Sequence, residues 1–366
     1  MPAPPVVSTL PGATFDCHGC GECCRSFDFG PVDDAVIENL LRLDAGSLVP
    51  GLAGGPFHET RQREDGPAHY FLRSGDACIF LDDAGRCRIH AAHGPQAKPW
   101  FCRAFPFAPV AGPEGLRLGW RPECAGRHKA APNPTPLAAH GPEVIADAEH
   151  YPFRAVFPKG TRLPGGVVPP HATYPAIERA LLAQAAEVRQ SFDAVFPALR
   201  TAMRAVEGAL GGEGLVETGE GASAWTEPLQ ALANAHRAAA AELQAVQPDT
   251  VQAWAASNVT RILASEPRPA ELDAAAANFL REELTNHIFT GATTVHDGLA
   301  AGFGTFLFAA LAVRGAAADR GGEPIGVEAL NHDWARWHRG TGWRDPLGDL
   351  EDLQGSFAKM FLAFDP

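Results

Sequence analysis

The feature that most constrains this chain is the crowding of its cysteines into one part of the sequence. The chain has 366 residues and 8 cysteines. Four of them form the block Cys17-His-Gly-Cys20-Gly-Glu-Cys23-Cys24, whose spacing is C-x2-C-x2-C-C. The other four follow at longer intervals, at Cys78, Cys87, Cys102 and Cys124. The prolines are also concentrated in this part of the chain. We therefore expect an irregular first module that is held together by cross-links rather than by long helices.

The spacing of the first block is typical of metal ligands. Two intervening residues let a tight turn point both sulfurs at one centre, and Gly19 and Gly21 permit the necessary backbone angles. Thiolates prefer a soft metal, so the block predicts zinc or an iron–sulfur cluster. The first three cysteines match the start of a bacterial ferredoxin loop, but the next ferredoxin cysteine would fall at Phe27. Cys24 either serves a different centre or supports the first.

The number of metal centres stays open at this point. The eight thiols can complete two four-ligand sites, or they can form one cluster while the others are structural. His18, His90 and His93 are alternative ligands. A disulfide framework is disfavoured because the first residues, MPAPPVVSTLPGATFD, lack the basic and apolar regions of a secretory signal. We therefore expect a cytoplasmic protein with reduced thiols.

The second part of the chain is rich in Ala, Leu and Glu and predicts a helical domain. The expected helices cover residues 175–190, 197–210, 226–246, 249–264, 270–290, 294–318 and 348–363. The longest apolar run, Leu299 to Val313, is shorter than the roughly 20 residues that a membrane span needs. We therefore expect it to form a buried core helix.

The expected fold class is mostly α, with an irregular, cysteine-rich, metal-organised N-terminal module packed on a C-terminal helical domain. The predicted ranges are 1–130 for the cysteine-rich metal-binding module, 131–175 for a Pro-rich wrap or linker, and 176–366 for the helical domain.

Within the first module we expect one helix and three short strands. The helix should cover Ala35 to Leu43 and bury Ile37, Leu40 and Leu41 on one face. The strands are expected around His69–Leu72, Cys78–Leu81 and Leu116–Trp120.

The charge of the chain limits its partners. A formal net charge of −13 argues against non-specific binding of nucleic acid or of an anionic membrane. Basic residues nevertheless exceed acidic ones between Arg61 and Lys129. We expect Arg88, Lys98 and Arg103 to offset thiolate charge or to bind an anionic group of a cosubstrate. No residue pattern identifies a catalytic residue.

The cysteine contexts carry a resemblance. In order along the chain, they are C-x2-C-x2-C-C, Cys78-Ile-Phe-Leu, Cys87-Arg-Ile-His, Gly94-Pro95, Lys98-Pro99 and Cys102-Arg-Ala-Phe-Pro-Phe. This series resembles the YkgJ-type CxxCxxCC family of zinc- or iron-chelating proteins over roughly residues 15–127. The resemblance implies that the eight cysteines are metal ligands.

The whole chain is also similar in layout to flagellin lysine-N-methylases, which follow such a module with a long helical region. Leu280 to Phe289 and the apolar helix after it resemble that region. This similarity implies S-adenosylmethionine as a methyl donor and a protein lysine as the acceptor, with an iron–sulfur (4Fe-4S) cluster holding the cosubstrate. The alternative function is a zinc-binding structural or protein-interaction module without catalysis.

Overall fold

The computed structural model divides the chain into two compact units that interleave along the sequence. The helical unit comprises Met1–Ala13, Ala108–Glu123 and Pro152–Pro366, and the cysteine unit comprises Thr14–Phe107 and Cys124–Tyr151. The structure describes residues 7–27, 30–52, 55–63, 66–112, 114–129, 131–146, 154–155, 161–163, 168–188, 191–210, 223–243, 257–260, 263–264, 271–291, 299–317 and 323–341.

These units divide the chain differently from the three consecutive ranges expected from composition. Residues 1–13 and 108–123 belong to the helical unit, because β1 pairs with β7 and β7 contacts α10. The stretch expected to be a wrap contributes to both units. Leu137 is fully buried in the cysteine unit, and Leu163 belongs to the core of the helical unit.

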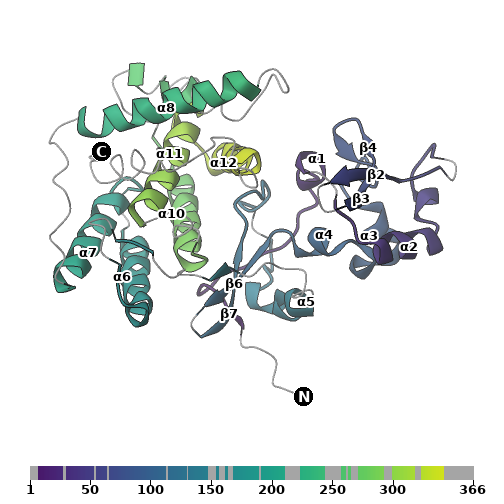
Figure 1. Cartoon of the computed structure of the whole chain (residues 1–366), viewed down its shortest axis with the longest axis horizontal. Helices are drawn as coiled ribbons and strands as arrows, with labels where there is room; N and C mark the ends of the chain where they lie inside the picture. The colour runs from purple at the N-terminus through teal and green to yellow at the C-terminus, as the bar shows by residue number, and fades with distance from the viewer. Residues whose placement is uncertain are drawn as a thin grey trace. The chain divides into compact units, whose positions relative to one another are not determined.

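The helical unit contains the long helices that the second part of the sequence predicts (Figure 1). Its helical segments are η5 (His171–Thr173), α6 (Tyr174–Glu187), α7 (Val195–Ala209), α8 (Ser223–Leu243), α10 (Ala274–Phe289), α11 (Leu299–Ala317) and α12 (Val327–Thr341). Asp273 caps α10, since its carboxylate accepts a hydrogen bond from the backbone N–H of Ala276 at 2.7 Å. The mostly α fold class is confirmed. The helix expected at 348–363 lies outside the described residues, and of the helix expected at 249–264 only residues 257–260 and 263–264 are described.

A four-stranded sheet also belongs mainly to this unit. Its strand order is β1 (Val7–Ser8), β7 (Gly115–Trp120), β6 (Phe107–Gly112) and β8 (Arg154–Ala155). β1 runs parallel to β7, and β8 runs parallel to β6. β7 contacts α10, a helix from a distant part of the sequence.

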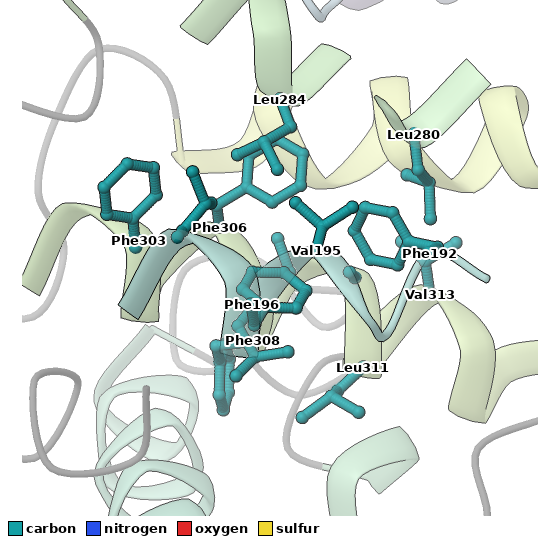
Figure 2. Packing of buried hydrophobic residues seen from close by; sticks show 14 of the residues in the cluster. Phe192, Val195, Phe196, Leu280, Leu284, Phe303, Phe306, Phe308, Leu311 and Val313 are labelled. Atoms are coloured by element: carbon teal, nitrogen blue, oxygen red, sulfur yellow. The ribbon is translucent and has the colours of Figure 1, made fainter. Parts of the chain in front are cut away.

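The core of the helical unit joins three phenylalanines of α11 to Phe196 of α7. Figure 2 shows Phe196 gathered with Phe306 and Phe308. The ring of Phe192, which precedes α7, lies 6.2 Å from that of Phe306 between centroids. Phe303 and Phe308 are fully buried, which confirms that the apolar run from Leu299 to Val313 is a core helix. Within the described ranges, none of the helices combines the length and apolar character that crossing a bilayer requires.

Buried polar groups attach β7 to α10. The carboxylate of Glu283 accepts hydrogen bonds from the indole nitrogens of Trp120, at 2.8 Å, and Trp334, at 3.3 Å. The Asn286 side chain bonds both backbone groups of Trp120, accepting from its N–H at 3.1 Å and donating to its carbonyl at 2.8 Å. The segment Leu280–Phe289 thus supplies polar anchors as well as apolar packing.

The cysteine unit is built from short elements. In chain order they are α1 (Cys23–Ser26), α2 (Asp34–Arg42), η1 (Ala45–Leu48), β2 (His58–Arg63), β3 (Gly66–Phe71), β4 (Arg73–Ser74), β5 (Ala77–Cys78), α3 (Arg88–His93), η2 (Pro95–Ala97), α4 (Trp100–Ala104), η3 (Leu137–His140) and α5 (Gly141–Ala146). β2 pairs with β3 and β4 with β5, both antiparallel. Phe57, Phe71 and Phe80 form the aromatic centre of its core.

Helix α2 confirms the expected helix but not its whole apolar face. Ile37 and Leu40 are buried, whereas Leu41 is 57% exposed. The core covers only one flank of the helix, because α2 packs against the short turns η1 and η2. Periodicity alone does not show which flank is covered.

The two adjacent leucines of α2 provide a matched stability test. We expect Leu40→Ala to lower the free energy of unfolding of the cysteine unit by about 2–5 kcal/mol, because it leaves a cavity in the core. Leu41→Ala should change it by less than about 0.5 kcal/mol, because the side chain is exposed. Denaturant unfolding of both variants measures the difference, and equal losses would contradict the assignment of the buried face.

Candidate metal centre

All eight cysteines lie in the cysteine unit, and none forms a disulfide. Cys17 and Cys20 are exposed, Cys78 is buried, and the others are partly buried. The first block forms a loop that leads into α1. Gly19 and Gly21 in this loop adopt positive φ angles of 62° and 72°, which L side chains rarely adopt. These two glycines therefore shape the loop as the spacing predicts.

The loop rests on the turn that precedes Cys87. In that turn the Asp82 carboxylate accepts hydrogen bonds from the backbone N–H groups of Ala84, at 3.0 Å, and Arg86, at 2.7 Å. Chiefly because of the Arg86 N–H bond, the pKa of Asp82 is lowered. A Cβ atom placed on Gly85 would lie 2.4 Å from the carbonyl oxygen of Gly19. The backbones of the two turns thus touch, and this contact brings Cys87 toward the first block.

This contact predicts a specific effect of Gly85→Ala. Gly85 has a φ of +77°, and the new methyl group would collide with the backbone of Gly19. We expect the loop of Cys17 and Cys20 to be displaced and the metal content of the purified protein to fall. Gly75→Ala is the matched control. Gly75 has a φ of +63°, and a Cβ atom placed on it would meet no atom within 4 Å.

The control should show conformational strain alone, about 1–2 kcal/mol of unfolding free energy, with metal content unchanged. Elemental analysis and denaturant unfolding compare the two variants. If both retained metal equally, the contact between the turns would not be needed for the centre.

A distant arginine holds α1 in place. The Arg73 guanidinium donates to the backbone carbonyls of Arg25, at 2.9 Å, and Phe27, at 3.3 Å. These carbonyls lie at the end of α1, where backbone acceptors lack partners within the helix. Arg73 thereby positions Cys23 and Cys24, a role that nothing in its local sequence indicates.

Burial keeps several of the thiols protonated. Burial raises the pKa of Cys78 and of Cys124 to about 12 in each case. It also raises the pKa of Cys102, while the hydrogen bond with Cys24 is the main cause of the raised pKa of Cys23. Backbone hydrogen bonds act in the opposite direction: Phe80 lowers the pKa of Cys78 and Gly126 lowers that of Cys124. Such bonds stabilise the thiolate form that a metal requires.

These pKa values predict that metal affinity depends on pH. A thiol with a pKa near 12 is protonated over the whole physiological range, so metal binding has to displace its proton. Each displaced proton should strengthen binding about tenfold per pH unit. We expect zinc affinity to rise steeply from about pH 6 to about pH 8 in competition titrations with a chromophoric chelator. A pH-independent affinity would show that Cys78 and Cys124 are not ligands.

The charge of Cys23 acts on the buried thiols Cys78, Cys102 and Cys124. Charges on Cys17, Cys20 and Cys23 all act on Cys124. Charges on Cys78, Cys87 and Cys23 all act on Cys102. The sulfur of Cys24 lies 3.9 Å from that of Cys23, and Cys24 and Cys87 both pack against the apolar core that includes Cys78.

The thiols lie in one unit but do not point at a common metal position. In the part of the chain that the structure describes, no group of three or more His, Cys, Asp or Glu side chains is arranged to hold a metal ion. Neutral thiols form only weak hydrogen bonds with one another and thiolates repel, so final convergence of such a site depends on the metal.

The alternative histidine ligands have varied surroundings. His18 Nε2 lies 2.8 Å from the backbone carbonyl of Lys129, which accounts for one ring nitrogen. His90 is exposed. His93 lies in α3, and its buried Nε2 has no hydrogen-bond partner within the described chain.

The cationic residues expected near the thiols are placed differently from one another. Lys98 lies close enough to Cys23 and Cys102 that its charge lowers the pKa of both thiols. The Arg103 guanidinium donates to the backbone carbonyl of Lys98 at 2.5 Å and to that of Gln96 at 3.4 Å. Its contacts therefore support the turn before α4. Arg88 begins α3 and has a buried Nε without a hydrogen-bond partner in the described structure.

Comparison with known families identifies this segment. Residues 16–125 match the family model named CxxCxxCC, which is described as "Putative zinc- or iron-chelating domain". The matched range contains all eight cysteines, and it confirms the resemblance seen in the N-terminal part of the sequence. No curated protein and no solved structure matches the chain.

Proposed function

We propose, from the premise that residues 16–125 carry a CxxCxxCC domain, that the cysteine unit binds zinc or iron through its thiols. The observation that carries this proposal is the gathering of all eight cysteines, without a disulfide, in one unit where Cys23 acts on Cys78, Cys102 and Cys124. The donor set is all sulfur, and soft thiolates fit zinc and iron. We place the protein in the cytoplasm, where such thiols stay reduced.

The metal has a structural role in this proposal. The longest helix of the described cysteine unit, α2, has 9 residues, and isolated helices of this length are marginal in water. Metal bonds between the first block and the turns at Cys78, Cys87, Cys102 and Cys124 would join segments that little secondary structure connects. A unit organised in this way can present the chain to a protein partner without catalysis.

Metal content and the optical spectrum of anaerobically purified protein test this function. We expect stoichiometric zinc or iron that survives extensive dialysis. Cys20→Ser and Cys78→Ser should both lose metal, whereas Ser47→Ala, on the surface of the same unit, should retain it. A wild-type protein without zinc or iron, prepared without chelators, would overturn the proposal.

A second candidate function is methyl transfer to a protein lysine at an iron–sulfur cluster. The observation that favours it is the exposure of Cys17 and Cys20, which would leave one face of a cluster accessible. Lys98, beside Cys23 and Cys102, and Arg88 are cations that an anionic group of S-adenosylmethionine could contact. In this reaction a neutral lysine amine would form a C–N bond to the methyl group as the C–S bond of the sulfonium breaks. The amine then loses a proton, and S-adenosylhomocysteine leaves.

Two measurements decide whether this second function holds. The protein should contain iron and acid-labile sulfide in equal amounts, with a broad absorption band near roughly 400 nm. Anaerobic calorimetry should detect S-adenosylmethionine binding that Lys98→Ala weakens and Lys129→Ala does not. A colourless zinc protein without affinity for S-adenosylmethionine would exclude methyl transfer and leave the structural metal centre in place.

A further inference from the structure

The chain that leads into the first cysteine block pairs with a segment beyond the residues that match the family model. This segment, the brace, comprises residues 131–140 (APNPTPLAAH) and lies in the cysteine unit. Thr14 and Pro136 form an antiparallel bridge, and the backbone N–H of Phe15 donates to the carbonyl of Thr135 at 2.9 Å. The brace therefore holds the start of the cysteine loop by backbone pairing.

One residue of the brace bonds both carboxylate oxygens of Asp16. The Thr135 backbone N–H donates to Oδ2 at 2.9 Å, and the Thr135 hydroxyl donates to Oδ1 at 2.7 Å. Pro134 and Pro136 flank Thr135 and have no backbone N–H, so Thr135 carries the only backbone donor of these three residues. Hydrogen bonds to a charged carboxylate are stronger than those between neutral groups. Because Asp16 directly precedes Cys17, this pair positions the chain next to the first thiol.

Two histidines extend the contact in both directions. His140 Nε2 lies 3.0 Å from the Phe15 carbonyl oxygen, and His18 Nε2 lies 2.8 Å from the Lys129 carbonyl oxygen. A carbonyl can only accept, so each of these ring nitrogens carries a proton and donates it. The His140 ring also packs on Phe107, with 4.7 Å between the ring centroids. These bonds hold the loop at its start and again inside the cysteine block.

The braced loop carries the exposed thiols of the unit. Cys17 and Cys20 are exposed, whereas Cys78 is buried in the core. A metal ion bound by the thiols would therefore be reached by solvent from the side of this loop. The brace itself is anchored, because the Leu137 side chain is fully buried. For the ion to leave, the loop would have to break its hydrogen bonds to the brace.

We propose that the brace controls the release of metal from the cysteine block, with Thr135 and His140 as positioning residues. This inference rests on the proposed thiol-based metal binding, and it adds a part of the chain that the family match does not include. While the loop is bonded to the brace, its thiols stay at the metal and the ion dissociates slowly. Without these bonds the loop opens more often, and the ion dissociates faster although no metal ligand has changed.

Transfer of bound metal to an excess of a chromophoric chelator of zinc or ferrous iron measures this release in the full chain. We expect Thr135→Val, which removes the hydroxyl with little change of shape, to release metal about tenfold faster than the wild type, or faster still. Thr135→Ser keeps the hydroxyl and should retain the slow rate. Thr60→Val is the matched control in the same unit, because it removes a hydroxyl that lies 3.1 Å from His69 Nδ1. It should release metal at the wild-type rate.

A second variant keeps the test independent of how Thr135→Val folds. His140→Phe retains an aromatic ring against Phe107 but cannot donate to the Phe15 carbonyl, so it should also release metal faster. Wild-type rates in both variants would overturn the role of the brace, and so would equally fast release from Thr60→Val. Metal content, measured first, separates this result from failure of the proposed function. Wild-type protein that holds neither zinc nor iron would overturn that function itself.

Discussion

Stripping the metal should unfold the cysteine unit while the helical unit keeps its structure. Structural zinc supplies about 10–16 kcal/mol of apparent free energy at neutral pH in zinc-finger peptides, and here it would act on a unit of short elements. We expect chelation to remove the hydrogen-exchange protection of the backbone N–H groups of Val32, Leu72 and Ile79. These groups donate to the carbonyls of other segments of the unit. Exchange measured by mass spectrometry with and without chelator provides the comparison.

The same experiment contains its own control. Amides of α10, in the helical unit, should keep their protection after chelation, and added zinc should restore protection in the cysteine unit. Unchanged exchange in both units would show that the metal does not stabilise the fold. Loss of protection in both units would show that the helical unit also depends on the metal.

The largest expected effect of a single substitution in the helical unit is that of Arg117→Met. Arg117 on β7 and Glu178 on α6 form a buried two-pronged ion pair, in which Nη2 lies 2.9 Å from Oε2 and Nη1 contacts Oε1. Their side chains are only 5% and 4% exposed. Arg117 Nη1 also donates to the carbonyl of Phe289, at the end of α10. Removing one partner of a buried pair leaves the other charge unpaired, so we expect a loss of about 3–5 kcal/mol of unfolding free energy.

Two further variants and a change of pH separate this cause from simple loss of packing. Arg179→Met removes an exposed arginine beside Glu178 and should change stability by less than about 0.5 kcal/mol. The double variant Arg117→Met, Glu178→Leu should regain most of the lost stability.

Burial already raises the pKa of Glu178, and Arg117 opposes this shift. Without Arg117 the carboxyl should be neutral in the folded state, with its pKa above the unfolded value of about 4.3. The loss of unfolding free energy in Arg117→Met should therefore be fully present well above that folded pKa. It should disappear below about pH 4. A deficit that did not depend on pH would indicate that packing, not the unpaired charge, is responsible.

The sequence predicted the local elements better than their grouping. Proline, cysteine and alanine content correctly separated a module of short elements from long helices such as α6 and α7. Composition did not reveal that Val7 pairs with Leu116, because a parallel strand pair between distant segments leaves no local pattern. The exposure of Leu41 was missed for a similar reason. Helical periodicity defines a stripe, but only tertiary contacts decide which edge of it is covered.

In the candidate site, too, the sequence predicts local geometry but not contacts between distant segments. Spacing identified the cysteine block, and the positive φ angles of Gly19 and Gly21 are the local geometry that it requires. The contact of Gly85 with Gly19 and the support of α1 by Arg73 join residues far apart in sequence. The Arg103 guanidinium likewise bonds backbone carbonyls, those of Lys98 and Gln96, which its position after Cys102 does not indicate. Side-chain direction in such turns depends on the neighbouring segments.

The interleaving of the two units also bears on how the chain folds during synthesis. The cysteine unit ends at residue 151, so all of it is synthesised before α6 to α12. At that stage β6 and β7 carry Val110, Leu118 and Trp120, apolar side chains that the finished protein buries. Trp120 also lacks its hydrogen-bond partners Glu283 and Asn286 until α10 is synthesised. Until those helices emerge, β6 and β7 expose an apolar surface on the nascent chain. We expect chaperones that recognise apolar strands to bind this surface.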